Sequence, residues 1–170
     1  GIAASGGTLS NLNALVAARN YAGLESDQNA VFLISEDAHS SFVKCSRIMG
    51  LGKNNLIKVK TDVNGCMDIV DLKNSIDKCS EDGKNIFSIV ATLGTTIRGA
   101  IDPIENISRI CRERNIWLHI DGSIGGIFAI TNLQINGISK VNFANSITIN
   151  PQKILGITKT SSILLVSDIE

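Results

Sequence analysis

A glycine-rich segment near the start of the chain has the composition of a phosphate site. Ser5-Gly6-Gly7-Thr8 directly precedes Leu9–Tyr21, an amphipathic stretch whose apolar spacing predicts a helix. Glycines allow close approach to the backbone, Thr8 offers a hydroxyl, and the first turn of a helix presents free N–H groups. The alternative is an ordinary helix start capped by Thr8 or Ser10. Because the segment is neither GxGxxG nor a Walker motif, both interpretations stay open.

A carboxylate ends a predicted buried strand. Asp121 closes the run Trp117–Asp121, and the small residues Gly122, Ser123, Gly125 and Gly126 follow it. In open α/β sheets, ligands bind in the crevice beyond the carboxyl ends of the strands. The small residues favour a ligand lying close by. The alternative role for Asp121 is an Asx turn or a helix cap.

A lysine and a histidine follow two further predicted strands. Lys153, in Asn150-Pro151-Gln152-Lys153, comes after Ser146–Ile149 and before an apolar stretch. Most lysines are solvated surface charges, but an apolar setting can make a lysine an amine nucleophile. His39 comes just after Ala30–Ser35. A lone histidine is usually structural, whereas one on the same rim as Asp121 could stack on an aromatic ring or move a proton.

These four features together fit one cofactor, pyridoxal phosphate. That cofactor needs a lysine amine, an acid partner for its pyridine nitrogen and a grip on its phosphate. An aspartate keeps the ring nitrogen protonated, so that the ring can accept electrons released at the substrate α-carbon. No metal site is expected.

Strand-like and helix-like segments alternate along the whole chain. The predicted strands are Ala30–Ser35, Leu56–Lys60, Ile86–Thr92, Trp117–Asp121, Ser146–Ile149 and Ser162–Val166. The predicted helices are Leu9–Tyr21, Phe42–Met49, Val70–Cys79 and Ile104–Arg114, with helix starts at Asp68 and at Asp102-Pro103. This alternation predicts an α/β fold with a mainly parallel sheet and helices on both faces.

The composition predicts one soluble globular domain. Of the 170 residues, 44% are hydrophobic, which suffices for a substantial core, and 16 Lys+Arg balance 16 Asp+Glu. Zero net charge gives no electrostatic basis for general nucleic-acid binding. No apolar stretch is long enough to span a bilayer, and no signal peptide is visible. The four cysteines form no CxxC pair, so we expect neither zinc nor disulfides but reduced thiols in a cytoplasmic protein.

Five stretches of the sequence resemble the PLP-dependent amino-acid decarboxylases, which include glutamate, cysteine-sulfinate, diaminobutyrate and aromatic amino-acid decarboxylases. They keep the family's order and spacing over nearly the whole chain, and GAIDPI is closer to the first three than to the aromatic branch. The stretches are SGGTLSNLNALVAAR (5–19), SEDAHSSFVKCSRIMGLG (35–52), VATLGTTIRGAIDPI (90–104), CRERNIWLHIDGSIGG (111–126) and ANSITINPQK (144–153).

The resemblance implies a role for each matching residue. Lys153 would hold pyridoxal phosphate as the internal aldimine, Asp121 would pair with the pyridinium nitrogen, and His39 would stack on the ring. Further cofactor contacts are implied for Gly7, Thr8 and Asn150, which would hold the phosphate, and for Thr96 and Ser123. The implied reaction converts an L-amino acid to an amine and carbon dioxide. Orientation of the scissile carboxylate over the ring would select decarboxylation over transamination.

The implied fold is the large domain of the aspartate-aminotransferase-like PLP enzymes, whose members are dimers with active sites at the interface. Both ends of the sequence look cut, so we expect residues 1–170 to be the PLP-binding large domain of a longer protein. The family's dimerisation segment, small domain and mobile catalytic loop have no counterpart here. The resemblance therefore implies that this stretch alone is a weak or inactive catalyst.

Two departures from the family pattern bear on the chemistry. Gln152 stands where many relatives have histidine, and glutamine cannot transfer a proton near neutral pH. Gly122-Ser123 stands where alanines are usual. The alternatives are another reaction on the same cofactor fold, such as transamination or desulfuration, and a non-catalytic, dimer-forming paralogue. A nucleotide-binding Rossmann module would leave Lys153 without a role.

Overall fold

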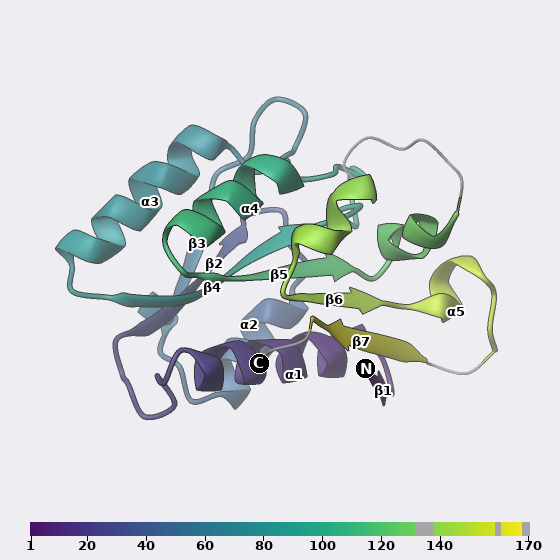
Figure 1. Ribbon diagram of the computed structural model, residues 1–170, viewed down its shortest axis with the longest axis horizontal. Helices are drawn as coiled ribbons and strands as arrows, with labels where there is room; N and C mark the ends of the chain where they lie inside the picture. Colours follow the sequence, from purple (N-terminus) through teal and green to yellow (C-terminus); the bar gives the residue numbers. More distant parts are fainter. Residues whose placement is uncertain (132–137, 159–160, 168–170) are drawn as a thin grey trace.

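The computed structural model describes residues 1–131, 138–158 and 161–167, and these form a mixed seven-stranded sheet. The strands lie in the order β1-β7-β6-β5-β4-β2-β3 (Figure 1). Their bounds are β1 Ile2–Ala4, β2 Ala30–Ser35, β3 Leu56–Val59, β4 Asn85–Thr92, β5 Trp117–Gly122, β6 Ser146–Ile149 and β7 Ser162–Val166.

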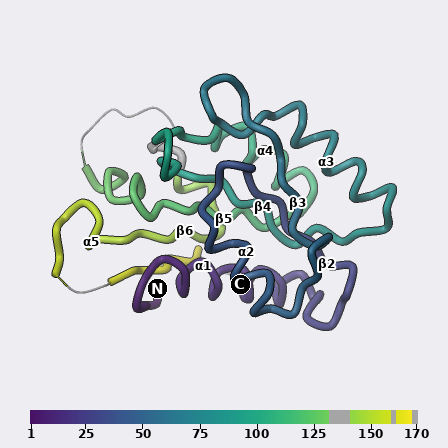
Figure 2. The backbone as a smooth tube through the Cα atoms, turned by 180° about the vertical axis from the view of Figure 1, so that it is seen from behind, coloured from purple at the N-terminus to yellow at the C-terminus, as the bar shows by residue number. Residues whose placement is uncertain are grey.

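Helices cover both faces of the sheet, as expected for this pattern. The pair α1 and α2 lies on one face and the pair α3 and α4 on the other, which is visible from both sides of the molecule (Figures 1 and 2). Two buried apolar clusters fill the space beneath these pairs. The helices are α1 Gly7–Tyr21, α2 Ser41–Ile48, α3 Ile69–Glu81, α4 Ile104–Glu113 and the single turn α5 Pro151–Ile154, with short 3₁₀ helices at Lys53–Asn55, Gly125–Ile130 and Ile138–Phe143.

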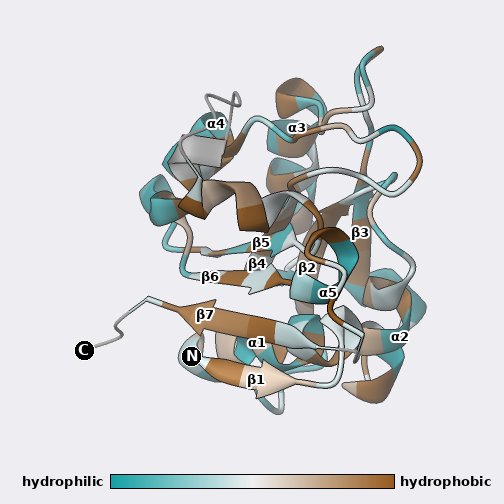
Figure 3. Cartoon of the chain, turned by 90° about the vertical axis from the view of Figure 1, so that its right-hand side faces the viewer, coloured by the Kyte–Doolittle hydropathy of each residue, from teal (hydrophilic) through white to brown (hydrophobic). Residues whose placement is uncertain are grey.

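The interior strand β2 shows why these runs are mostly apolar. All six of its residues are buried. Val31 and Leu33 belong to the cluster beneath α3 and α4, whereas Phe32 and Ile34 belong to the cluster beneath α1 and α2. Successive side chains of a strand point to opposite faces, so a strand covered on both faces needs apolar residues at every position. Figure 3 shows the hydrophobic colouring of such strand runs most clearly on β7.

Strand direction brings the chemistry-bearing loops to one edge of the sheet. Strands β2 to β6 are parallel to one another, so their carboxyl ends lie at the same edge of the sheet. Strand β7 is antiparallel to β6, and β1 is antiparallel to β7. The sequence patterns did not predict β1, because its three residues are too few to show a periodicity and two of them are exposed.

The predicted elements agree closely with the structure. Each predicted strand end lies within one residue of the observed end, and each predicted helix end within two. Asp68 caps α3 as expected, since its Oδ1 accepts from the N–H groups of Val70 and Asp71 at 2.7 and 3.0 Å. Asp102 also precedes a helix, but α4 has no side-chain cap, and the Asp102 carboxyl has other partners.

The cysteines are free thiols, as expected. Cys45, Cys79 and Cys111 are buried and Cys66 is half-buried. Burial raises the pKa of Cys45 to about 11 and that of Cys111 to about 12. These thiols therefore stay protonated near neutral pH and act as small packing groups. Among the described residues, no helix has both the length and the apolar character that crossing a membrane would require.

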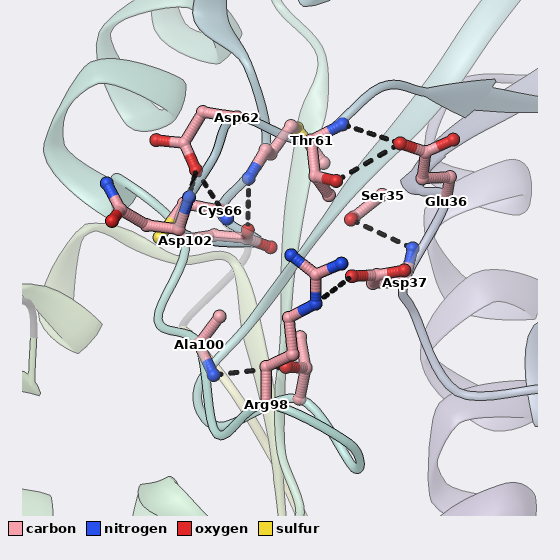
Figure 4. Close-up of polar contacts among 12 residues, drawn as sticks. Ser35, Glu36, Asp37, Thr61, Asp62, Cys66, Arg98, Ala100 and Asp102 are labelled. Atoms are coloured by element: carbon pink, nitrogen blue, oxygen red, sulfur yellow. Dashed lines mark hydrogen bonds and ion pairs between the residues drawn. The ribbon is translucent and has the colours of Figure 1, made fainter.

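The Asp102 carboxyl joins β4 to the loop after β3 (Figure 4). Its Oδ1 accepts from the Met67 N–H and its Oδ2 from the Thr92 N–H, both at 2.7 Å. The side chain is buried, and desolvation raises its pKa to about 6 despite these two donors, which lower it. The cost of burying the charge thus outweighs the benefit of the two hydrogen bonds.

Asp102 should make the stability of the protein depend on pH. A carboxyl with a higher pKa in the folded than in the unfolded state contributes stability that is complete below the unfolded pKa and is lost as pH rises through the folded pKa. We expect the free energy of unfolding to gain on the order of 2–3 kcal/mol from this group between pH 7 and pH 4. Urea unfolding of the unmodified protein and of Asp102→Asn, each at pH 7 and at pH 4, measures this contribution. The comparison isolates Asp102 because every other carboxyl titrates alike in the two proteins. The free energy of unfolding of the unmodified protein should rise by this amount relative to that of Asp102→Asn, and a relative value that is unchanged or falls on acidification would contradict the assignment.

Candidate active site

A cleft of about 480 Å³ lies at the carboxyl ends of β4, β5 and β6, against the start of α1. Every residue that the sequence predicted for the site lines it: Gly7, Thr8, His39, Thr96, Asp121, Ser123, Asn150 and Lys153. The cleft has a buried floor, which includes Asp121, Ser123 and Asn150. Its rim is exposed and includes Thr8, His39 and Lys153. Residues up to 146 positions apart in the sequence are thus brought into one site by the parallel sheet.

Asp121 is held in the floor by two hydrogen-bond donors. Its Oδ2 accepts from Asn11 Nδ2 at 3.0 Å, and its Oδ1 accepts from the Ser123 N–H at 3.1 Å. The second bond is the Asx turn that was the alternative role for Asp121. The turn and the position in the cleft therefore occur together, and the turn fixes the plane of a carboxylate that is only 4% exposed.

The glycines after Asp121 pack against protein backbone, which corrects the expectation that they make room for a ligand. A Cβ on Gly125 would lie 2.7 Å from the Leu93 carbonyl oxygen, and one on Gly122 would lie 2.9 Å from that of Thr148. Neither glycine lines the cleft. Their small size instead lets the chain after β5 lie tightly between the ends of β4 and β6.

The glycine-rich segment forms a cradle rather than an ordinary capped helix start. Gly6 has φ of 137°, and neither Thr8 nor Ser10 caps α1. The first intrahelical bonds run from the N–H groups of Leu9 and Ser10 to the Gly6 carbonyl, so the N–H groups of Gly7 and Thr8 precede them. Such N–H groups at the start of a helix suit an anion.

Asn150 faces this cradle in a fixed orientation. Ser10 Oγ donates to Ser162 Oγ at 2.7 Å, and Ser162 Oγ donates to Asn150 Oδ1 at 2.6 Å. The Asn150 amide therefore turns its Nδ2 donor towards Gly7, where a Cβ would lie only 2.6 Å away. No local pattern predicts that Ser10 and Ser162 orient this amide, because they are 152 positions apart.

His39 lies on a loop that is tied to its neighbours on both sides (Figure 4). Glu36 Oε1 accepts from the N–H and the hydroxyl of Thr61, at 2.9 and 3.1 Å. Asp37 pairs with Arg98 on the loop after β4, at 3.5 Å. The imidazole Nδ1 of His39 accepts from the Ser41 N–H at 3.1 Å, which leaves Nε2 as its protonated nitrogen in the neutral ring.

Lys153 lines the cleft from the single turn α5, but it is not enclosed by apolar side chains. Lys153 is exposed, and its neighbours Ile154 and Leu155 are 44% and 59% exposed. The expected apolar setting is therefore wrong for the described residues. Lys153 is exposed because α5 lies on the rim, where its side chain and those of Ile154 and Leu155 face outward. Pro151 is the buried residue of the turn.

The donors in the cleft suit a phosphorylated, nitrogen-containing ring. Two buried hydroxyls, those of Ser41 and Thr92, line the cleft and have no hydrogen-bond partner within the described chain. Unpartnered buried hydroxyls are costly and mark places where a ligand can supply the missing bond. Together with the cradle at Gly7, the carboxylate and the lysine, they fit pyridoxal phosphate. In the described ranges, no cluster of His, Cys, Asp and Glu could hold a metal ion.

Sequence reasoning missed three residues of the floor, Asn11, Ser41 and Thr92. Asn11 was within reach of prediction, because it follows Gly7 and Thr8 by four and three positions and so lies on the same face of α1. Ser41 and Thr92 carried no signal, since a single hydroxyl in a buried segment is usually satisfied by its own backbone.

Comparison with known proteins gives one family along the whole chain. Residues 1–170 match the family model of the pyridoxal-dependent decarboxylase conserved domain. The chain is 34% identical over 175 residues to acidic amino acid decarboxylase GADL1 of Xenopus tropicalis and 33% identical over 175 residues to a glutamate decarboxylase-like protein of Gibberella zeae. Each alignment covers 99% of this chain and 34% of the relative.

A solved structure gives the same result. The crystal structure of mouse CSAD matches with a TM-score of 0.92 and 29% identity, over 100% of this chain and 37% of that chain. This likeness confirms the expected fold class. The chain spans about a third of the length of these relatives.

Gly7→Ala should damage the cradle specifically. The new Cβ would meet Asn150 Nδ2 at 2.6 Å and Ser123 Oγ at 2.8 Å, so both side chains would have to move. We expect the affinity for pyridoxal phosphate to fall by about tenfold or more, as for the loss of a charge-assisted hydrogen bond. Isothermal titration measures this, with pyridoxal, which lacks the phosphate, as the control ligand. Equal losses for both ligands would show that Gly7 does not serve the phosphate.

Proposed function

The chain belongs to the pyridoxal-dependent decarboxylase family, and from this premise we propose that residues 1–170 are the cofactor-binding large domain of an amino-acid decarboxylase. The reaction we propose is the conversion of an L-amino acid to an amine and carbon dioxide. One observation carries the proposal: a single cleft gathers the lysine, the carboxylate, the histidine and the glycine cradle that this chemistry needs.

The floor of the cleft would hold the cofactor by its two ends. Backbone N–H groups of Gly7 and Thr8, together with the Asn150 amide, would bind the phosphate, and Ser123 lies beside them. Asp121 would accept a hydrogen bond from the protonated ring nitrogen. When bound, pyridoxal phosphate supplies a ring that accepts electrons from the substrate α-carbon.

The rim would position the reacting groups. Lys153 Nζ would hold the cofactor covalently and give way to the substrate amine, His39 would lie against the ring face, and Thr96 would contact its edge. Besides the Lys153 amine, the described rim presents the Nε2–H of His39, whereas Gln152, which also lines the cleft, cannot transfer a proton. His39 is thus our candidate for moving a proton within the described part of the site.

We further propose that the substrate is an acidic amino acid. The relatives at 33% and 34% identity are named as a glutamate decarboxylase-like protein and as an acidic amino acid decarboxylase. The GAIDPI stretch, residues 99–104, favours the same branch. Transamination on the same cofactor is the alternative, and analysis of the products separates the two reactions.

We also propose a homodimer in the cytoplasm. Large apolar side chains stand exposed around the mouth of the cleft, among them Ile48 at 66% and Ile97 at 91%. A second copy would cover them. Sedimentation equilibrium tests this, and a monomer at micromolar concentration would contradict it. The four free thiols support a reducing compartment.

Lys153→Ala should abolish covalent attachment of the cofactor. We expect borohydride reduction of the protein with pyridoxal phosphate to leave one pyridoxyl group on Lys153, located by mass spectrometry, and none in the variant. Release of carbon dioxide from glutamate and other acidic amino acids should be lost together with the adduct, because the same amine serves both.

Lys78→Ala is the matched control, since Lys78 is exposed on α3 on the far side of the sheet from α1. It should keep both the adduct and the release of carbon dioxide. Labelling spread over surface lysines, or an adduct that survives in Lys153→Ala, would overturn the assignment of Lys153.

A further inference from the structure

Behind Asp121, a row of buried side chains runs away from the cleft between α1 and the face of the sheet that it covers. Asn11 Nδ2 donates to Asp121 Oδ2 at 3.0 Å, and Asn11 Oδ1 lies 3.1 Å from His119 Nε2. His119 Nδ1 lies 2.9 Å from Ser146 Oγ, which also accepts from Trp117 Nε1 at 2.8 Å. The residues come from α1, β5 and β6, and each is at most 4% exposed.

Hydrogen-bond chemistry allows one direction for this row. At the cleft end, a carboxylate oxygen only accepts, so Asn11 must turn its NH₂ group towards Asp121 and its oxygen towards His119. His119 Nε2 must then carry a hydrogen. At the far end, the Trp117 indole only donates, so Ser146 accepts from it and has its own hydrogen free for His119 Nδ1. The Asn11 end thus requires a hydrogen on His119 Nε2, and the Ser146 hydroxyl, which can accept or donate, is compatible with a neutral ring that carries no hydrogen on Nδ1.

The surroundings of His119 keep the ring neutral. The ring is fully buried, and desolvation lowers its pKa to about 4, although the Asp121 carboxylate and a hydrogen bond with the Ser146 backbone act in the opposite direction. From α1 and β6 the ring is faced by Asn11 and Ser146, which carry no charge. Every donor from Trp117 to Asn11 is therefore uncharged near neutral pH.

This neutrality matters for the carboxylate at the end of the row. Within the described chain, the two ion pairs involve Asp37 and Asp77, and Asp121 has no cationic partner. A lysine or arginine in place of Asn11 would neutralise Asp121 from behind. An amide instead fixes one carboxylate oxygen in space and leaves the negative charge for a cation in the cleft.

We propose that Asn11 is the positioning residue of Asp121, and that His119, as the Nε2–H tautomer, donates to the Asn11 oxygen and so fixes the orientation of the Asn11 amide. The hydrogen on Nε2 follows from the contacts of Asn11, and the burial of the ring keeps it neutral. The consequence for the cofactor, stronger binding of its protonated ring nitrogen, rests on the function proposed above.

The tautomer is tested by nitrogen NMR of the ¹⁵N-histidine-labelled protein. The chain has two histidines, His39 and His119, so a spectrum of His39→Gln assigns the signals. We expect His119 to show a protonated Nε2 and an unprotonated Nδ1 near neutral pH. A protonated Nδ1, in either the other tautomer or the imidazolium ion, would overturn the proposal.

The effect on the cofactor is tested by binding, without turnover. In Asn11→Leu, which removes the donor at similar size, we expect the affinity for pyridoxal phosphate to fall about tenfold or more. The affinity for its 1-deaza analogue, which lacks the ring nitrogen, should change by less than about twofold, because that analogue cannot use Asp121. Asn20→Leu, an exposed position on the same helix, is the matched control and should change neither affinity.

Equal losses for both ligands in Asn11→Leu would mean that Asn11 serves only the fold, and would overturn its positioning role. Failure of the unmodified protein to bind pyridoxal phosphate would instead overturn the proposed function. The histidine spectrum would then still decide whether the row has the direction described above, so the two failures are distinguishable.

Discussion

A carboxylate buried at the end of a central strand must find hydrogen-bond donors within the protein, because desolvation without them costs several kcal/mol. Asp121 finds two, the Asn11 amide and the Ser123 N–H. The first requires α1 to lie against the carboxyl end of β5, and the second requires a tight turn directly after the strand. The same helix start supplies the glycine cradle, so the donor to the carboxylate and the site for an anion come from one rigid element.

Close packing at the edge of the sheet makes this arrangement possible. Gly122 and Gly125 let the chain after β5 lie against the backbone of its neighbours, where any side chain would collide with a carbonyl oxygen. The parallel strands β4, β5 and β6 then place Thr92, Asp121 and Asn150 side by side at their carboxyl ends. The floor of the cleft is therefore as rigid as the sheet itself.

The floor and the rim of the cleft differ in burial and therefore in what they can do. The floor residues are buried. Asp121 is hydrogen-bonded to Asn11 and to the Ser123 N–H, and Asn150 is hydrogen-bonded to Ser162, so these groups are held in fixed positions. The rim residues His39, Thr96 and Lys153 are exposed, and apolar side chains such as Ile97 stand beside them. A site with a rigid floor and an open rim can hold one cofactor while the surfaces over the rim select the substrate.

The sequence by itself determined the alternation of strands and helices, the parallel sheet and the edge at which Asp121 and Lys153 would lie, because periodicity and strand ends are local properties of the chain. It also supplied, through the family motifs, eight residues that line the cleft. Only the tertiary structure decided which polar groups orient these residues. Ser10 with Ser162, and Asn11 with His119, are more than 100 positions apart, and no local pattern encodes a hydrogen bond between them. The exposure of Lys153 was likewise undecided by its apolar neighbours, since burial depends on which elements cover α5 and not on the residues beside it.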